Sequence, residues 1–144
     1  MKVKEIEDVN SVIQLHEKIF NKPFPLQSYY KKNSIYKVDI YVYEENSNLL
    51  GYSIVVDQEK EKNFYAWYGG VLPKFQGRGI TEKFFKVLIE NARKKGYKSI
   101  TLATTNSRPN MIRLAVKMGF EIYDLKKRNY GEGNKIYFQY KILS

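Results

Sequence analysis

Short apolar segments with strand-like patterns are spread along the whole chain. Residues 38–43 alternate between apolar and more polar side chains, and residues 49–57 follow a turn at 45–48, so the two segments predict a hairpin. Residues 64–71 are apolar on both faces, as in a strand at the centre of a sheet. Further strands are expected at residues 3–6, 99–103, 121–127 and 135–143.

Apolar residues at helical spacing predict four helices. The first is capped by Asp8 or Asn10, ends near Phe20 and carries His16 on its apolar stripe, where we expect a packed residue rather than a catalyst. The other helices are expected at residues 26–32, 81–95 and 109–118. The element order βαα-ββ-βαβα-ββ predicts an α/β (mixed α+β) fold, with one domain spanning residues 1–144.

A Gly-rich turn connects the predicted central strand to the helix expected at 81–95. Its sequence is Gln76-Gly77-Arg78-Gly79-Ile80-Thr81. The first turn of a helix has unpaired N–H groups and a partial positive charge, and glycine lets a ligand approach the backbone closely. The turn is therefore either an anion site for phosphate or pyrophosphate, or an ordinary strand-to-helix loop with two glycines.

Composition narrows the possible functions. The chain has 144 residues, 43% hydrophobic and 28% charged, which are values typical of a globular domain. It has no cysteine, which excludes disulfides, thiolate zinc sites and a cysteine nucleophile, and its single histidine excludes a multi-histidine metal site. We see no apolar run of membrane-spanning length and no N-terminal signal pattern, so we expect a metal-free, cytoplasmic protein with no membrane contact.

The net charge of +10 has two interpretations. A basic protein can bind nucleic acid or an acidic partner, or its lysines can be solubilising charges with a few that serve an anionic ligand. The lysines are scattered, and no nucleic-acid recognition motif accompanies them. We therefore do not expect a nucleic-acid partner.

Two segments of the chain resemble a known family. The turn, preceded by Val71 and Pro73, and the segment 111–120, which ends in Gly119-Phe120, are similar to two signatures of the GNAT superfamily of acetyl-CoA-dependent N-acetyltransferases. Together with the element order, the resemblance covers nearly the whole chain. It implies a twisted mixed sheet of about seven strands with about four helices, splayed between the fourth and fifth strands.

The resemblance also implies where acetyl-CoA would bind. The pantetheine arm would pair with the fourth strand near its end, and the turn would hold the pyrophosphate. The cofactor-binding residues implied are Val71, Leu72, Gln76, Gly77, Arg78, Gly79, Ile80 and Thr81. Thr81 departs from the family pattern, which usually has Gly or Ala there. A family asparagine that contacts the cofactor is replaced by Arg108, so either Asn106 or Arg108 is expected to take its role.

Catalysis is where the chain departs most from the family. The resemblance implies that a primary amine of a small molecule or protein attacks the thioester directly in a ternary complex, which agrees with the absence of cysteine. The usual tyrosine acid is replaced by Ala115, and residues 64–71 contain no carboxylate. We name Tyr68 and Tyr130 as catalytic candidates, although a packed aromatic is the favoured interpretation of Tyr68. A non-catalytic acyl-CoA-binding module is the alternative function, and a monomer or homodimer is expected.

Overall fold

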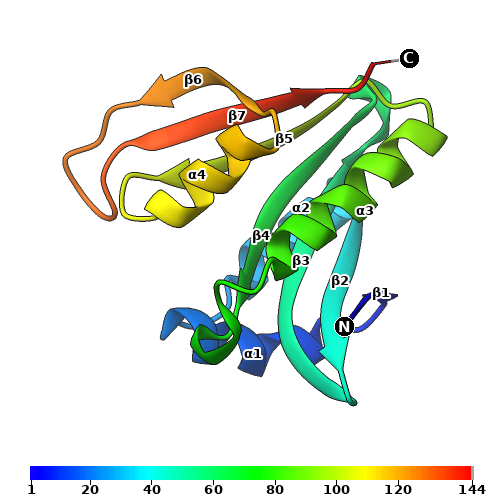
Figure 1. Ribbon diagram of the computed structural model, residues 1–144, viewed down its shortest axis with the longest axis vertical. Helices are drawn as coiled ribbons and strands as arrows, with labels where there is room; N and C mark the ends of the chain where they lie inside the picture. Colours follow the sequence, from blue (N-terminus) through cyan, green and yellow to red (C-terminus); the bar gives the residue numbers. More distant parts are fainter. Residues whose placement is uncertain (144) are drawn as a thin grey trace.

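A seven-stranded mixed sheet in the order β1-β2-β3-β4-β5-β7-β6 runs through the described part of the protein (Figure 1). The structure is a computed structural model that describes residues 1–143. β4 and β5 are parallel, and every other neighbouring pair in the sheet is antiparallel. The strands are β1 (Lys2–Ile6), β2 (Lys37–Glu45), β3 (Asn48–Gln58), β4 (Asn63–Val71), β5 (Ser99–Thr105), β6 (Glu121–Lys126) and β7 (Lys135–Lys141).

The predicted element order and mixed fold are confirmed. The helices are α1 (Asn10–Phe20), α2 (Leu26–Ile35), α3 (Ile80–Lys94) and α4 (Pro109–Lys117), with short 3-10 turns η1 (Glu59–Glu61) and η2 (Pro73–Phe75). Asp8 accepts a hydrogen bond from the N–H of Asn10 (2.9 Å) at the start of α1. α2 is longer than predicted and ends where Tyr36 becomes extended, its N–H still donating to the carbonyl of Lys32 (2.8 Å). No helix within residues 1–143 combines the length and apolar character needed to cross a membrane.

The sheet separates two apolar cores. One core includes Phe84, Phe85 and Leu88 of α3, and the other is built on α1 and α2. Alternate residues of β2 enter opposite cores: Tyr41 packs with α3, whereas Ile40 packs with α1 and α2. This arrangement explains why the middle strands are apolar on both faces. Figure 1 shows α3 in front of the sheet and α2 behind it.

β4 and β5 pair only along their first halves and then diverge (Figure 1). Their pairing ends at Ala66 and Leu102. Directly after this point β4 has a bulge, because Tyr68 faces Ile54 of β3 and Ala66 faces Val55, which leaves Trp67 as the extra residue. A bulge increases the local twist of a strand. The predicted splay between the fourth and fifth strands is therefore confirmed.

Two glycines that follow the bulge allow close packing around the end of β4. A Cβ atom at Gly69 would lie 2.6 Å from Ser53 Oγ of β3, and one at Gly70 would lie 2.9 Å from side-chain atoms of Ile19 and Phe20 of α1. Both distances are too short for a real Cβ atom. The absence of side chains here lets α1 pack directly on the backbone of β4, which fixes Phe20 beside the end of the strand.

Candidate functional site

The backbone of β4 has polar groups without a strand partner where β5 diverges. The N–H of Leu72 donates to the carbonyl of Leu50 in β3 (2.8 Å), so residue 72 faces β3. Backbone groups alternate in direction along an antiparallel strand, and Gly69 and Val71 occupy the alternate register positions. Their N–H and C=O groups therefore point away from β3, towards the side that β5 leaves open. We call these groups the β4 edge.

Leu72 differs from Val71 in what it offers to a ligand. Its N–H is already bonded to β3, and its side chain lines a hollow of about 490 Å³ between α1 and the β2–β3 hairpin, together with Leu15, Leu49 and Phe75. The predicted contact of Leu72 with a cofactor stays a prediction, and the β4 edge favours Val71 for a backbone contact.

The Gly-rich turn follows the β4 edge after η2. Gly77 (φ 80°) and Gly79 (φ 75°) have left-handed backbone conformations, which favour glycine. Within residues 1–143, the N–H groups of 77–82 donate to no protein acceptor, and the first α3 bond runs from Lys83 N–H to Gly79 O (3.1 Å). A Cβ atom at either glycine would meet no atom within 4 Å. The turn therefore presents free donors to open space at the positive end of α3.

The side chains of the turn are held by the protein itself. Gln76 donates its amide N–H to the carbonyl of Val71 (3.0 Å), which braces the turn against the end of β4. The Arg78 guanidinium pairs with Glu45 (3.2 Å) and lies over the Phe75 ring. Thr81 lies in the first turn of α3, which has no side-chain cap at its N-cap, Gly79. The side chains of Gln76 and Arg78 are therefore engaged within the protein, whereas the backbone N–H groups of residues 77–82 are free.

Asn106 and Arg108 lie between β5 and α4 but have different partners. Asn106 Oδ1 accepts the N–H of Asn134 (2.8 Å), so its side chain is used to fasten the β6–β7 loop to the end of β5. Arg108 lies over the Phe20 ring (4.7 Å from its centroid) and pairs with Glu132 of the β6–β7 loop (3.3 Å). The cofactor contact of Asn106 or Arg108 stays a prediction.

Tyr68 lies in an aromatic cluster where α1 meets the end of β4. Its ring centroid is 5.3 Å from that of His16, 5.4 Å from Trp67 and 5.8 Å from Phe20. Tyr68 is 36% exposed, so it is packed on one side and accessible on the other. Tyr130 is on the exposed β6–β7 loop, where its ring contacts the Arg128 guanidinium (5.3 Å).

His16 is a buried member of the same cluster. Its Nδ1 is hydrogen-bonded to the Tyr52 hydroxyl (2.5 Å), and both side chains are fully buried. Burial lowers the pKa of His16 from its usual range, against opposing effects of Glu17 and of a hydrogen bond to the backbone of Pro23. The sequence predicted a packed histidine, which the structure confirms. No signal in the sequence indicated that this histidine would lie beside Tyr68.

The lowered pKa of His16 predicts a loss of stability in acid. The unfolded histidine takes up a proton near pH 6.5, whereas the folded one does so only at lower pH, so stability is complete above pH 6.5 and falls as the pH drops. The free energy of unfolding should decrease by at most about 1.4 kcal/mol per pH unit from this residue. Urea unfolding at pH 7.5, 6.5 and 5.5 measures how steeply the free energy of unfolding changes with pH. His16→Gln should reduce this slope, and an equal slope in the variant would mean that His16 does not cause the loss of stability.

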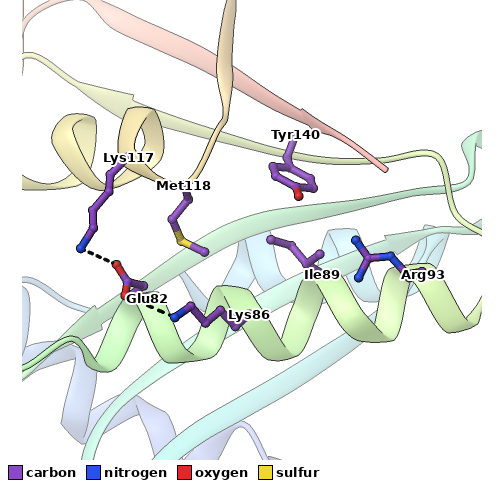
Figure 2. A pocket seen from close by; sticks show the side chains of 7 residues that line it. All are labelled: Glu82, Lys86, Ile89, Arg93, Lys117, Met118 and Tyr140. Carbon is purple, nitrogen blue, oxygen red and sulfur yellow. Dashed lines mark ion pairs between the residues drawn. The ribbon is translucent and has the colours of Figure 1, made fainter. Parts of the chain in front are cut away.

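A separate pocket of about 440 Å³ lies between α3, the end of α4 and β7 (Figure 2). Its lining residues are Glu82, Lys86, Ile89, Arg93, Lys117, Met118 and Tyr140. Glu82 bridges Lys117 (2.8 Å) and Lys86 (3.6 Å), and the bond to Lys117 lowers the pKa of the Glu82 carboxyl. The pocket includes neither the β4 edge nor the residues 76–81, so it is distinct from the site described above.

Comparison with solved structures places the fold among acetyltransferases. The ribosomal-protein-S18-alanine N-acetyltransferase from Escherichia coli is 16% identical with a TM-score of 0.85, covering 98% of this chain and 93% of its own. Ard1 from Thermoplasma volcanium is 14% identical with a TM-score of 0.79, and the match covers 99% of this chain and 98% of the Ard1 chain. A GNAT family acetyltransferase from Elizabethkingia anophelis, solved with acetyl-CoA bound, is 20% identical with a TM-score of 0.75, covering 97% of each chain. At these identities the likeness shows the fold alone.

A family model shows membership directly. No match to the chain was found among curated proteins. The model described as "Acetyltransferase (GNAT) family" matches residues 9–120, which is more than half of the chain and includes the turn and the Gly119-Phe120 segment. The chain therefore belongs to the GNAT acetyltransferase family.

Proposed function

We propose that this acyltransferase is an N-acetyltransferase that moves an acetyl group from acetyl-CoA to a primary amine of a small molecule or a protein. The observation that carries the proposal is the β4 edge, where the N–H groups of Gly69 and Val71 and the carbonyl of Gly69 have no strand partner, next to the free N–H groups of residues 77–82. An extended arm with amide groups fits the first feature, and a pyrophosphate fits the second. The acetyl-CoA bound to the Elizabethkingia anophelis relative supports the choice of ligand.

The chain's own groups suit this ligand. Val71 and Gly69 would hold the arm by backbone hydrogen bonds, and residues 77–81 would hold the phosphates. Bound acetyl-CoA would supply a thioester for direct attack. The open space around Gly77 and Gly79 leaves room for phosphate oxygens to reach the backbone. Asn106 and the side chains of Gln76 and Arg78, which already have protein partners, would act by shaping the site.

The acceptor amine must lose a proton before it attacks, because amines of pKa about 10 are charged at neutral pH. Tyr68 is the proposed site-lining hydroxyl, since it is partly exposed beside the end of β4. Nearby cations such as Arg108 lower the pKa of a bound amine and so favour its neutral form. Ala115, at the family's usual tyrosine position, is 1% exposed and packed in the core, so any acid must come from elsewhere, and Tyr130 is the second candidate.

A non-catalytic acyl-CoA-binding module is the second candidate function. The observation that favours it is Ala115, together with the absence of a carboxylate along β4. The module would use the same β4 edge and turn and would have no acceptor site. The cytoplasmic location, the single domain over residues 1–144 and the monomeric or homodimeric state stay predictions.

Two measurements on the same protein separate these functions. Calorimetry measures acetyl-CoA binding, and release of free CoA thiol measures transfer across a panel of amines, amino acids, peptides and polyamines. We expect binding and turnover, with Tyr68→Phe reducing kcat by about tenfold or more while the acetyl-CoA Kd stays within about twofold. Tyr123→Phe, on the exposed strand β6, is the matched control. Binding without turnover on any acceptor would support the module, and no binding would overturn both functions.

A further inference from the structure

Arg108 joins three elements around the Tyr68 cluster. It precedes α4, its guanidinium lies over the ring of Phe20 at the end of α1, and its Nη2 donates to Glu132 in the β6–β7 loop. Phe20 in turn contacts Tyr68, with 5.8 Å between ring centroids. A single aromatic ring therefore separates the guanidinium of Arg108 from the proposed site-lining tyrosine.

The ion pair between Arg108 and Glu132 uses only some of the N–H donors of the guanidinium. One contact of 3.3 Å joins the two side chains, which are 40% and 39% exposed. An arginine can hold a carboxylate by two parallel hydrogen bonds, and an exposed pair with one contact is weak. The cation–π contact with the Phe20 ring holds the guanidinium in place independently of Glu132. A better-placed carboxylate can therefore replace Glu132 without moving Arg108 from Phe20.

The surrounding charges favour an anionic group at this position. Lys32 lies over the Trp67 ring (4.8 Å), next to Tyr68, and Arg128 lies over Tyr130 on the same loop as Glu132. Lys22 and Arg108 both act on the buried His16, opposed by Glu17. The chain as a whole has a net charge of +10. An acceptor with a carboxylate would be attracted to this region, and a purely cationic amine would be repelled.

We propose, on the basis of the proposed function, that Arg108 binds a carboxylate of the acceptor and that Glu132 occupies the place of that carboxylate when no acceptor is bound. The acceptor class is then a primary amine that also carries a carboxylate, either a free amino acid or an acidic peptide. Because Arg108 and Tyr68 contact the same Phe20 ring, a short acceptor can reach both with its two ends. This role makes Arg108 a specificity-determining residue of the acceptor site rather than a cofactor ligand.

Matched acceptors test the proposal. Acetyl transfer is measured for the wild-type protein with β-alanine and its amide, with glycine and glycinamide, and with the dipeptides Ala-Asp and Ala-Asn, both amidated at the C-terminus so that only the aspartate carries a carboxylate. We expect kcat/KM to favour the carboxylate in at least one class of pair by about tenfold or more, because a charge-assisted hydrogen bond is lost in the amide. The amino-acid pairs and the dipeptide pair show which source of carboxylate the site accepts. The preference should decrease at high salt.

Variants of Arg108 and Glu132 show whether Arg108 causes the preference for a carboxylate acceptor. Arg108→Met keeps an unbranched apolar stem over Phe20 and should reduce the carboxylate preference to about threefold or less, through KM, while leaving the acetyl-CoA Kd unchanged. Glu132→Gln should lower KM for the carboxylate acceptors. Arg113→Met is the matched control, since Arg113 lies on α4, the helix that Arg108 precedes, and pairs only with Asn110 among the described residues.

Several outcomes would overturn the proposal while leaving the proposed function intact. They are transfer to neutral amines with no preference, a preference that persists in Arg108→Met, and a loss of acetyl-CoA affinity in that variant, which would assign Arg108 to the cofactor. If acetyl-CoA binds but no acceptor turns over, the proposal is tested by calorimetric titration of each carboxylate acceptor into the protein with CoA bound. Binding that depends on Arg108 supports the proposal, and its absence in the wild-type protein overturns it.

Discussion

Replacement of Gly79 by valine is expected to abolish measurable acetyl-CoA binding while the chain stays folded. Gly79 has φ 75°, a conformation that a β-branched residue avoids, and the N–H groups on both sides of it are free. To relieve the strain, the turn must rotate these donors away from their common direction. Calorimetric titration should show a loss of affinity of about a hundredfold or more, since several hydrogen bonds to phosphate are lost together.

A second glycine of the same conformation provides the control. Gly96 follows α3 at its other end with φ 72°, and a Cβ atom there also meets nothing within 4 Å. Gly96→Val should therefore carry a similar backbone strain, of about 1 to 3 kcal/mol, without changing the acetyl-CoA Kd. Gly79→Asn, which tolerates the left-handed conformation, should keep most of the affinity. Unchanged affinity in Gly79→Val would remove the turn from the binding site.

Phe84→Ala is expected to cost about 3 to 5 kcal/mol of the free energy of unfolding. Phe84 is completely buried on α3 and packs against Tyr41 and Tyr43 of β2 and against Phe85. Its removal leaves a cavity between α3 and the sheet, at a point where several large rings meet and cannot collapse easily. Urea unfolding followed by circular dichroism measures the change, at constant pH and salt.

Ile35→Ala is the control for this loss. Ile35 ends α2 and is 66% exposed, so the same kind of truncation should change stability by less than about 0.5 kcal/mol. An equal loss in both variants would mean that the core does not lie between α3 and the sheet. A Phe84→Ala variant with wild-type stability would also mean that the core does not lie between α3 and the sheet.

The sequence predicted the elements that local patterns determine. The alternation along 38–43 and the double-sided apolar run at 64–71 correspond to β2 and β4, and the Gly-rich turn lies between β4 and α3 as expected. The splay followed from the family resemblance rather than from these patterns. The position of the bulge could not be predicted from these patterns, because the shift at Trp67 depends on the register in which β4 pairs with β3.

The partners of the candidate site residues were outside the reach of sequence patterns. The helical stripe indicated that His16 is packed, but its bond to Tyr52 depends on how α1 crosses β3. The contact of Arg108 with Phe20 joins two segments that are far apart in the chain, and it arises because Gly70 lets α1 approach β4. Such contacts are set by tertiary packing, which no local periodicity encodes.

An amide NMR titration of the uniformly ¹⁵N-labelled protein with CoA tests most directly whether the β4 edge and the Gly-rich turn bind the cofactor. The β4 edge and the turn should respond together, so the largest shifts are expected at Gly69, Val71 and residues 77–81, whose N–H groups are free in the structure. Amides of Arg93 and Tyr140, in the separate pocket behind α3, should change little. Shifts centred on Arg93 and Tyr140, with the turn unchanged, would mean that CoA does not bind at the β4 edge and the turn.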